Sequence, residues 1–185
     1  MKKIFLDCGT HYGEGLSNFI SAFSMDSSWE IYSFEPNNYL CSEHNRQNVY
    51  ENITYINKAI YVHNNTIKFN IAYPNTDASS IYKTHIGDNF YESVLVECVD
   101  LSQFILDNFS IEDYIVLKMD IEGAEYEVLR KMIKDNSINY IKDLYVEFHS
   151  HKDHHSITEN GENKESTFNL IDQIKQLNIK FTHWI

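Results

Sequence analysis

The stretch Ile4-Phe5-Leu6-Asp7-Cys8-Gly9-Thr10-His11-Tyr12-Gly13-Glu14-Gly15 lies near the start of the chain and joins an apolar run to three glycines. The apolar run predicts a short buried strand over residues 3–7, and the glycines predict a tight turn. A helix over residues 15–23 follows, because its apolar residues recur on one face: Leu16, Phe19, Ile20 and Phe23. This order of elements is typical of the first unit of an α/β fold.

The residues after this unit repeat the same order of elements. A second strand over residues 30–35 is closed by Pro36, Asn37 caps a helix to about residue 50, and residues 53–56 form a third strand. Further strands are expected at residues 114–119, 144–148 and 181–184, with helices after residue 123 and over residues 167–177. The sequence therefore predicts an α/β fold with a doubly wound, mostly parallel sheet and helices on both faces.

The middle of the chain departs from this pattern. Residues 59–62 and 66–72 flank His63-Asn64-Asn65, which predicts an antiparallel hairpin added to the main sheet. Residues 94–99 alternate like a strand. Residues 73–89 are polar and predict a surface loop, which we expect to take part in substrate choice.

The composition limits the classes of partner. With 185 residues, 43% of them hydrophobic, the chain fits one domain over residues 1–185. The net charge of −12 argues against nucleic acid, whose phosphates are bound by Lys and Arg, and favours a small substrate or a sugar chain. No apolar run reaches the roughly 20 residues of a membrane span, and Asp7 interrupts any signal peptide. The separated Cys8, Cys41 and Cys98 fit reduced thiols, which predicts a cytoplasmic protein.

The glycine-rich turn indicates a ligand at the ends of the strands. The dinucleotide pattern G-x-G-x-x-G is not matched, because His11 stands where its second glycine would be. Asp7 directly before the turn favours a partly cationic ligand, and Asp7, Gly9 and Gly13 form the D-x-G-x-x-x-G arrangement seen where S-adenosylmethionine binds. An ordinary tight turn with an acid beside it is the alternative interpretation.

Glu35 ends the second strand within Phe34-Glu35-Pro36 and suits both hydroxyls of a ribose as an acceptor. Its distance from the turn also fits a nicotinamide enzyme, so Glu35 alone does not separate the two cofactors. The predicted cofactor-binding residues are Asp7, Gly9, Thr10, His11, Gly13, Glu35, Pro36 and Asp120.

The segment YIVLKMDIEGAEYEVLRKM, residues 114–132, resembles the K-x-D-x-E-G-x-E block of FkbM-type S-adenosylmethionine-dependent methyltransferases. The block residues are Lys118, Asp120, Glu122, Gly123 and Glu125, and the pieces DCGTHYG, FEP, VECVDL and YVEFH agree in order over residues 5–149. The resemblance implies a class I, Rossmann-like methyltransferase fold and methylation of a hydroxyl on a sugar, glycan or polyketide-type product.

Two features depart from the family pattern. Thr10-His11 stands where a small residue and Asn are common, and the chain stops at HWI, where the resemblance implies final antiparallel strands. Either the tail is minimal, or the chain is one domain of a longer protein.

Methyl transfer to a hydroxyl needs a base within hydrogen-bond reach, and Asp120 at the end of the fourth strand is the predicted one. Strand alternation points Lys118 the same way, and Glu122 falls near the start of the next helix. A buried ion pair is the alternative for Lys118, and a helix-terminal acid is the alternative for Glu122. Glu125 is expected to brace the loop.

A second cluster, Glu147-Phe148-His149-Ser150-His151, follows the last central strand. Glu147 or His149 is predicted to act as a base or to orient the substrate. A divalent metal held by Glu147, His149 and His151 is a less favoured alternative, because histidine-rich polar loops are often only solvated.

The leading hypothesis is an S-adenosylmethionine-dependent O-methyltransferase. The alternatives are a non-catalytic cofactor-binding module and, less favoured, a nicotinamide-dependent oxidoreductase. Methylation of nucleic acid bases is disfavoured, because Met119-Asp120-Ile121-Glu122 replaces the Asn/Asp-Pro-Pro-aromatic motif of that class.

Overall fold

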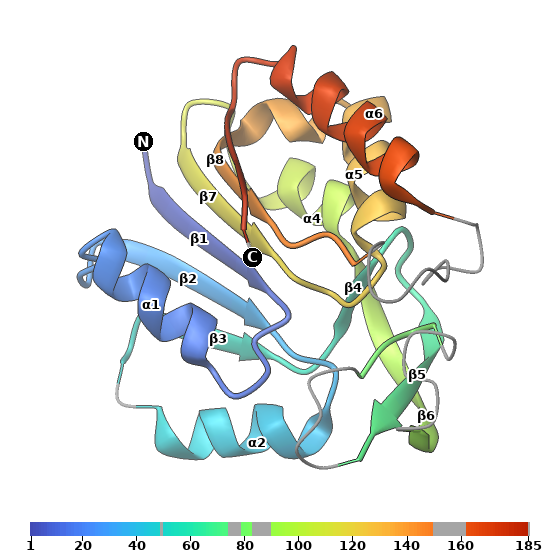
Figure 1. Ribbon diagram of the computed structural model, residues 1–185. Helices are drawn as coiled ribbons and strands as arrows, with labels where there is room; N and C mark the ends of the chain where they lie inside the picture. The colour runs from blue at the N-terminus through green and yellow to red at the C-terminus, as the bar shows by residue number, and fades with distance from the viewer. Residues whose placement is uncertain (49, 74–78, 83–89, 150–161, 185) are drawn as a thin grey trace.

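The computed structural model describes residues 1–48, 50–73, 79–82, 90–149 and 162–184. These residues form a six-stranded sheet of order β3-β2-β1-β7-β8-β9 and a three-stranded sheet of order β4-β6-β5 (Figure 1). Neighbouring strands of the larger sheet are all parallel. The prediction of an α/β fold with a mostly parallel sheet is confirmed.

The first half of the large sheet follows the predicted alternation. Its elements are β1 (Lys3–Cys8), α1 (Glu14–Ala22), β2 (Trp29–Phe34), α2 (Asn38–Gln47) and β3 (Ile53–Ile56). Asn37 caps α2 as expected, because its side chain accepts hydrogen bonds from the backbone N–H groups of Tyr39 and Leu40.

The second half of the large sheet lies on the other side of β1. Its elements are β7 (Tyr114–Met119), α5 (Glu125–Lys134), the short 3₁₀ helix η2 (Ser137–Tyr140), β8 (Ile141–Val146), α6 (Lys164–Lys175) and β9 (Lys180–His183). The predicted edge strand is present as β9. It pairs in parallel with β8, not in the antiparallel direction that the resemblance implied.

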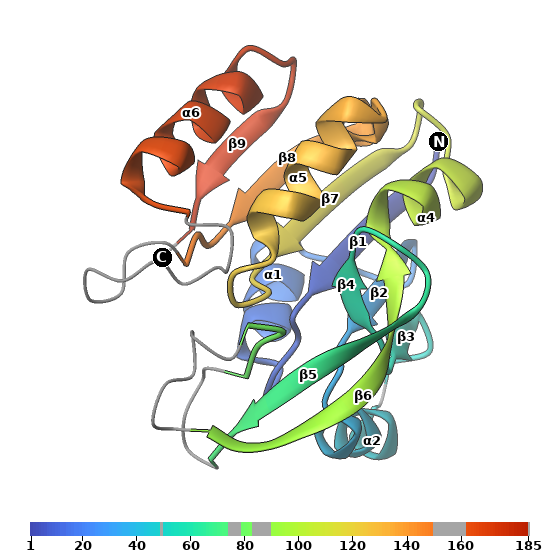
Figure 2. The ribbon, with the colours of Figure 1, turned by 90° about the vertical axis from the view of Figure 1, so that its right-hand side faces the viewer.

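The predicted hairpin between β4 (Ala59–Tyr61) and β5 (Thr66–Ala72) is wrong. Both strands pair with β6 (Phe90–Asp100), which lies between them and leads into α4 (Leu101–Asn108) (Figure 2). Only β5 is antiparallel to β6. The connection before β5 crosses the end of β6, where Asn64 Oδ1 and Asn65 O accept the backbone N–H groups of Asp100 and Cys98. These two hydrogen bonds attach residues 64–65 to β6, where the sequence predicted a tight turn between β4 and β5.

Two apolar layers cover the sheet, as the alternation of β1 requires. Helix α1 lies on one face of the large sheet, and α4, α5 and α6 lie on the other (Figure 1). Phe5 stacks on Phe19 of α1, while Ile4, Leu6 and Cys8 join the larger layer beneath α4, α5 and α6. By the same alternation, Asp7 lies on the α1 side, and so does Lys118 next to it in the register of β7.

Two further features of the described residues bear on function. The strand order reverses between β1 and β7, and such a switch point is where open α/β sheets bind ligands, beyond the carboxyl ends of the strands. Across the described ranges no helix combines the length and apolar character that crossing a membrane requires.

Candidate active site

Acidic residues gather at the switch point, where β1, β2, β7 and β8 end. Asp7 lies near the end of β1. Three further acids each directly follow the last residue of a strand: Glu35, Asp120 and Glu147. The β1–α1 turn lies among them. The fold therefore brings together residues that are more than 100 positions apart in the sequence, such as Asp7 and Lys118.

The β1–α1 turn packs directly on the end of β7. Gly9 has a φ of 86°, and a Cβ on it would lie 1.8 Å from the carbonyl oxygen of Asp120. The backbone N–H groups of Gly9 and Thr10 donate to Phe34 O, and that of Gly13 donates to Thr10 O. The Thr10 hydroxyl also faces inward, toward Ser33 and Phe34 O. The hydrogen bonds of Gly9 and Thr10 thus attach the turn to the end of β2.

Glu35, the residue directly after β2, is 5% exposed and binds the backbone of the same turn. Its two carboxylate oxygens accept the backbone N–H groups of His11 (2.8 Å) and Asn37 (2.7 Å). Burial raises the pKa of Glu35 to about 7, although the two N–H groups oppose that shift. Pro36 follows, half-buried, at the entrance to α2.

His11 is held in place from the other side by a residue that sequence reasoning left unassigned. His11 has a φ of 49°, and its carbonyl oxygen accepts a 2.6 Å hydrogen bond from His44 Nε2. The His44 ring stacks on Tyr55, with centroids 5.2 Å apart. Nothing in the local sequence pattern marks His44, because its partners come from other elements.

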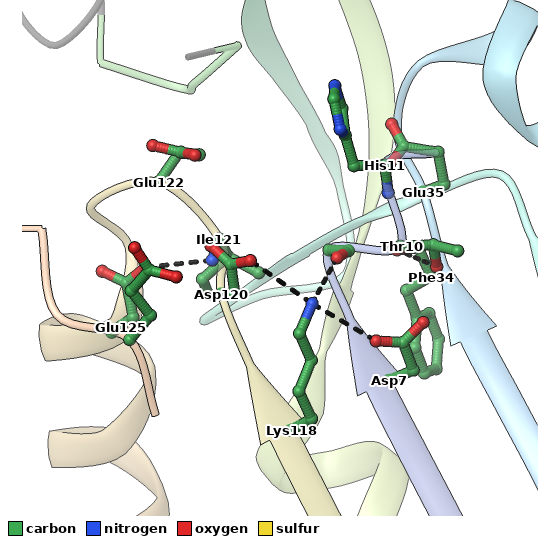
Figure 3. A network of polar contacts seen from close by, with 12 residues as sticks. Asp7, Thr10, His11, Phe34, Glu35, Lys118, Asp120, Ile121, Glu122 and Glu125 are labelled. Carbon is green, nitrogen blue, oxygen red and sulfur yellow. Dashed lines mark hydrogen bonds and ion pairs between the residues drawn. The ribbon is translucent and has the colours of Figure 1, made fainter. Parts of the chain in front are cut away.

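A buried lysine links β1 to β7 beneath the turn. Lys118 is 2% exposed and points between Asp7 and Asp120 (Figure 3). Its Nζ donates to Gly9 O at 2.6 Å. The same Nζ lies 3.4 Å from Asp7 Oδ1 and 3.4 Å from Asp120 Oδ2. Asp7, which is fully buried, also accepts a hydrogen bond from Ser33. Lys118 therefore holds the turn, β1 and Asp120 in one network.

The charges in this network differ in exposure. Burial opposes the charge of Lys118, but the attraction of Asp7 and Asp120 outweighs it and raises the pKa of Lys118. The Asp120 side chain is 22% exposed. Burial raises the pKa of Asp120 to about 6, against the opposing attraction of Lys118 and His149. Asp120 is therefore the member of the network that solvent and a ligand can reach.

Glu122 stands on a loop that is fixed from two sides. Its φ is 54°, in the left-handed region that few non-glycine residues adopt, and its carbonyl oxygen accepts the Ser80 hydroxyl. The fully buried Glu125 accepts the backbone N–H group of Ile121 (Figure 3). It also accepts the backbone N–H group of Gly123. Glu125 braces the loop, as expected from the sequence.

His149, which follows β8, is 2% exposed and surrounded by carboxylates. Its Nδ1 donates to Glu125 Oε1 at 3.0 Å. Its Nε2 lies 3.4 Å from Glu122, 3.5 Å from Glu147 and 3.7 Å from Asp120. Burial opposes the charge of His149, but Glu125 and the other acids raise its pKa to about 11.

The structure thus places the predicted catalytic residues Asp120, Lys118, Glu122, Glu147 and His149 in one connected cluster. Glu35 and the turn lie beside it. The predicted participation of His151 in a metal site falls outside the described residues. Sequence reasoning missed the contact between Glu125 and His149 and the role of Ser33, whose only sequence signal is a small polar residue within the apolar strand IYSFE.

Comparisons with known proteins agree with this fold. A sequence model described as "Methyltransferase FkbM domain" matches residues 7–177. No curated protein matches the chain. The crystal structure of methyltransferase FkbM from Methylobacillus flagellatus KT, at 2.20 Å resolution, is similar with a TM-score of 0.51 and 17% sequence identity. The match covers 95% of this chain but only 37% of that one, so this chain spans little more than a third of its length.

Proposed function

This chain belongs to the family of FkbM methyltransferases, and from that membership we propose that it is an S-adenosylmethionine-dependent O-methyltransferase. We propose as its acceptor a hydroxyl of a sugar, a glycan or a related natural product, and residues 1–185 as one methyltransferase domain. The observation that carries the proposal is the meeting of Glu35, the β1–α1 turn and the partly exposed Asp120 at the switch point of the sheet.

The residues at this place fit the cofactor in charge and in hydrogen bonding. Glu35 would accept the two ribose hydroxyls, since each carboxylate oxygen keeps a lone pair beyond its backbone hydrogen bond. The surplus of carboxylates over cations suits a ligand with a sulfonium and an ammonium group. Asp7 has no exposed surface, so we assign it to the support of Lys118. When bound, the cofactor supplies a methyl group on a positively charged sulfur.

Asp120 is the residue that we propose as the base. A hydroxyl is a poor nucleophile until its proton leaves, and a pKa of about 6 leaves Asp120 largely ionised at neutral pH. His149 would instead hold its proton there, because its pKa is about 11. We therefore assign to His149 and Glu125 the positioning of the acids around the acceptor, and to Lys118 the orientation of Asp120.

The geometry gives less support to a nicotinamide cofactor. In that class the N–H groups of the first turn face a pyrophosphate. Here the N–H groups of Gly9, Thr10 and Gly13 donate to oxygens of the chain itself. A non-catalytic binding module is the less favoured alternative, because the partly exposed Asp120 is oriented by Lys118 at the place where an acceptor would meet the cofactor.

Two measurements on one variant test the proposal. Asp120→Asn should lower transfer of a labelled methyl group by roughly 10²–10⁴-fold, the usual contribution of a general base. The melting temperature should still rise when S-adenosylhomocysteine is added, because Glu35 and the turn are intact. The acceptor panel would contain neutral oligosaccharides and nucleotide sugars.

Matched variants complete this test. Glu51→Gln removes one exposed carboxylate just before β3, at the amino end of a parallel strand, whereas Glu35 lies at the carboxyl end of β2, so this variant should change neither measurement. Glu35→Ala should remove most of the rise in melting temperature. If Asp120→Asn transfers the methyl group at the wild-type rate, Asp120 is not the base. If the wild-type chain shows no rise with either S-adenosyl compound, the proposed cofactor is wrong.

A further inference from the structure

Three side chains beside the proposed acceptor position have the composition and spacing of a metal-ligand set. One oxygen each from Asp120 and Glu122 and a ring nitrogen of His149 all lie within 4.8 Å of one another. The two carboxylate oxygens are 3.7 Å and 3.4 Å from His149 Nε2. Ligands that share an ion at roughly 2.1 Å lie about 3–4 Å apart, so small adjustments would bring all three onto one ion.

A buried carboxylate outside this set fixes the direction of the imidazole. Glu125, with no exposed surface, accepts the Nδ1 proton of His149 at 3.0 Å. The opposite ring nitrogen, Nε2, is thereby directed at Asp120 and Glu122. Metal-binding histidines are usually oriented in this way by a carboxylate on their second nitrogen. Glu125 is itself fixed by the backbone N–H groups of Ile121 and Gly123.

The balance of charge also favours a cation at this point. Four carboxylates, those of Asp120, Glu122, Glu125 and Glu147, lie within 3.7 Å of the ring of His149. Lys118 on the far side of Asp120 is shared with the buried Asp7. Even when the imidazole of His149 is charged, the four carboxylates leave an excess of negative charge. Because these side chains are largely shielded from solvent, a paired or coordinated cation would stabilise that charge.

We propose that Asp120, Glu122 and His149 bind a divalent metal ion, with Glu125 orienting the histidine. Two carboxylates with one imidazole favour an ion that accepts both oxygen and nitrogen ligands, such as Mn²⁺. The ion would take the place of the proton on Nε2 as the positive charge that these carboxylates surround. Glu147, whose Oε1 lies 3.5 Å from Nε2, is within reach as a further ligand.

A catalytic consequence follows, and it rests on the proposed function. An ion between Asp120 and Glu122 would lie next to the acceptor and polarise its hydroxyl. Asp120 would coordinate through Oδ1, the oxygen that faces His149, and keep Oδ2, the oxygen that faces Lys118, for the proton.

Titration of the chain with Mn²⁺ alone, followed by electron paramagnetic resonance, tests the site directly. We expect saturable binding of one ion and, in pulsed measurements, a hyperfine coupling from a coordinated imidazole nitrogen. Glu122→Gln should weaken the affinity by at least the ~10-fold that loss of an outer ligand partner costs. His149→Gln should remove the nitrogen coupling, and the exposed Glu51→Gln serves as the charge-matched control with unchanged binding.

The outcomes separate this proposal from the proposed function, because neither cofactor nor acceptor is present. Absence of saturable binding, or bound Mn²⁺ without nitrogen coupling in the wild-type chain, overturns the metal site even if the variants fold poorly. Glu35→Gln should keep the Mn²⁺ affinity while it loses the response to S-adenosylhomocysteine. A metal site that persists in a chain without methyl transfer would therefore contradict only the proposed reaction.

Discussion

The pKa of Glu35 shows how burial in the folded chain changes the ionisation of one side chain. In the folded chain burial raises its pKa to about 7, above the ordinary value of 4.5. A carboxyl group whose folded pKa is raised favours the folded state while it is protonated. Its contribution is therefore complete below pH 4.5 and is lost as the pH rises through 7.

This sign gives a prediction for Glu35→Gln. Glutamine stays neutral, so the variant should gain stability relative to the wild type between pH 5 and pH 8, by an amount on the order of 2–3 kcal/mol. Any constant cost of the amide cancels in this comparison. Urea unfolding of both chains at the two pH values measures it, with Glu51→Gln as the control. A difference that stays the same at both pH values would contradict the buried, titrating carboxylate.

At this scale the sequence identified the acids but not their partners. Glu35 and Asp120 were predictable because each follows an apolar strand. The pairing of Glu125 with His149, 24 residues later, was not, since it depends on how α5 and the end of β8 pack together.

At the level of elements, the β1–α1 turn packs so closely on the end of β7 that Gly9 has no room for a side chain. Gly9 combines a positive φ with backbone contact to Asp120, whereas Gly15 in α1 has neither. A Cβ on Gly15 would lie 3.4 Å from Lys118, which is an ordinary contact, and 3.3 Å from the partly buried ring of Trp184, which would have to shift by a few tenths of an ångström.

The two glycines form a matched pair of variants. Gly9→Ala should destabilise the fold by roughly 3–5 kcal/mol, because the turn must leave either β7 or its own backbone conformation. Gly15→Ala should stay within about 1 kcal/mol, since alanine is the better helix former. Denaturant unfolding of both variants measures the difference. Equal stabilities would show that the turn does not pack on Asp120 as described.

The order of elements was predictable for the large sheet, whereas the strand pairing predicted for the small sheet was wrong. In the large sheet, strands and helices alternate at regular spacing, and the short connections leave few alternative strand pairings. The pairing of β5 with β6 instead of β4 depends on chain segments about 30 residues apart, such as Thr66 and Glu97, for which local patterns contain no signal.

Across the whole molecule, the small sheet is attached to the candidate site. Ser80, which bridges to Asn70 of β5, donates its hydroxyl to Glu122 O at 2.5 Å. Nearby, the Tyr82 hydroxyl donates to Glu127 of α5 at 2.6 Å. The inserted strands thus support the loop that presents Glu122.

Ser80→Ala should test this attachment. The variant removes the hydroxyl of the fully buried Ser80, which donates to Glu122 O and accepts the backbone N–H of Tyr82. Loss of these hydrogen bonds should cost roughly 1–3 kcal/mol, and Mn²⁺ affinity should fall with it. Ser93→Ala removes a hydrogen bond to Asn70 inside the small sheet and should leave Mn²⁺ affinity unchanged. Unfolding curves and the Mn²⁺ titration measure both effects. An unchanged affinity in Ser80→Ala would mean that the small sheet does not support Glu122.

Local sequence signals were enough to predict the large parallel sheet, its helices and the acids at the strand ends, because hydrophobic periodicity, caps and glycine turns act over a few residues. The accessibility of each side chain in the site, in contrast, depends on contacts between residues that are distant in the sequence. Lys118 and Asp120 are two residues apart on one strand face, yet one is buried as a brace and the other is partly open to a ligand. That difference arises from Asp7, Gly9 and His149, which only the folded chain brings into contact.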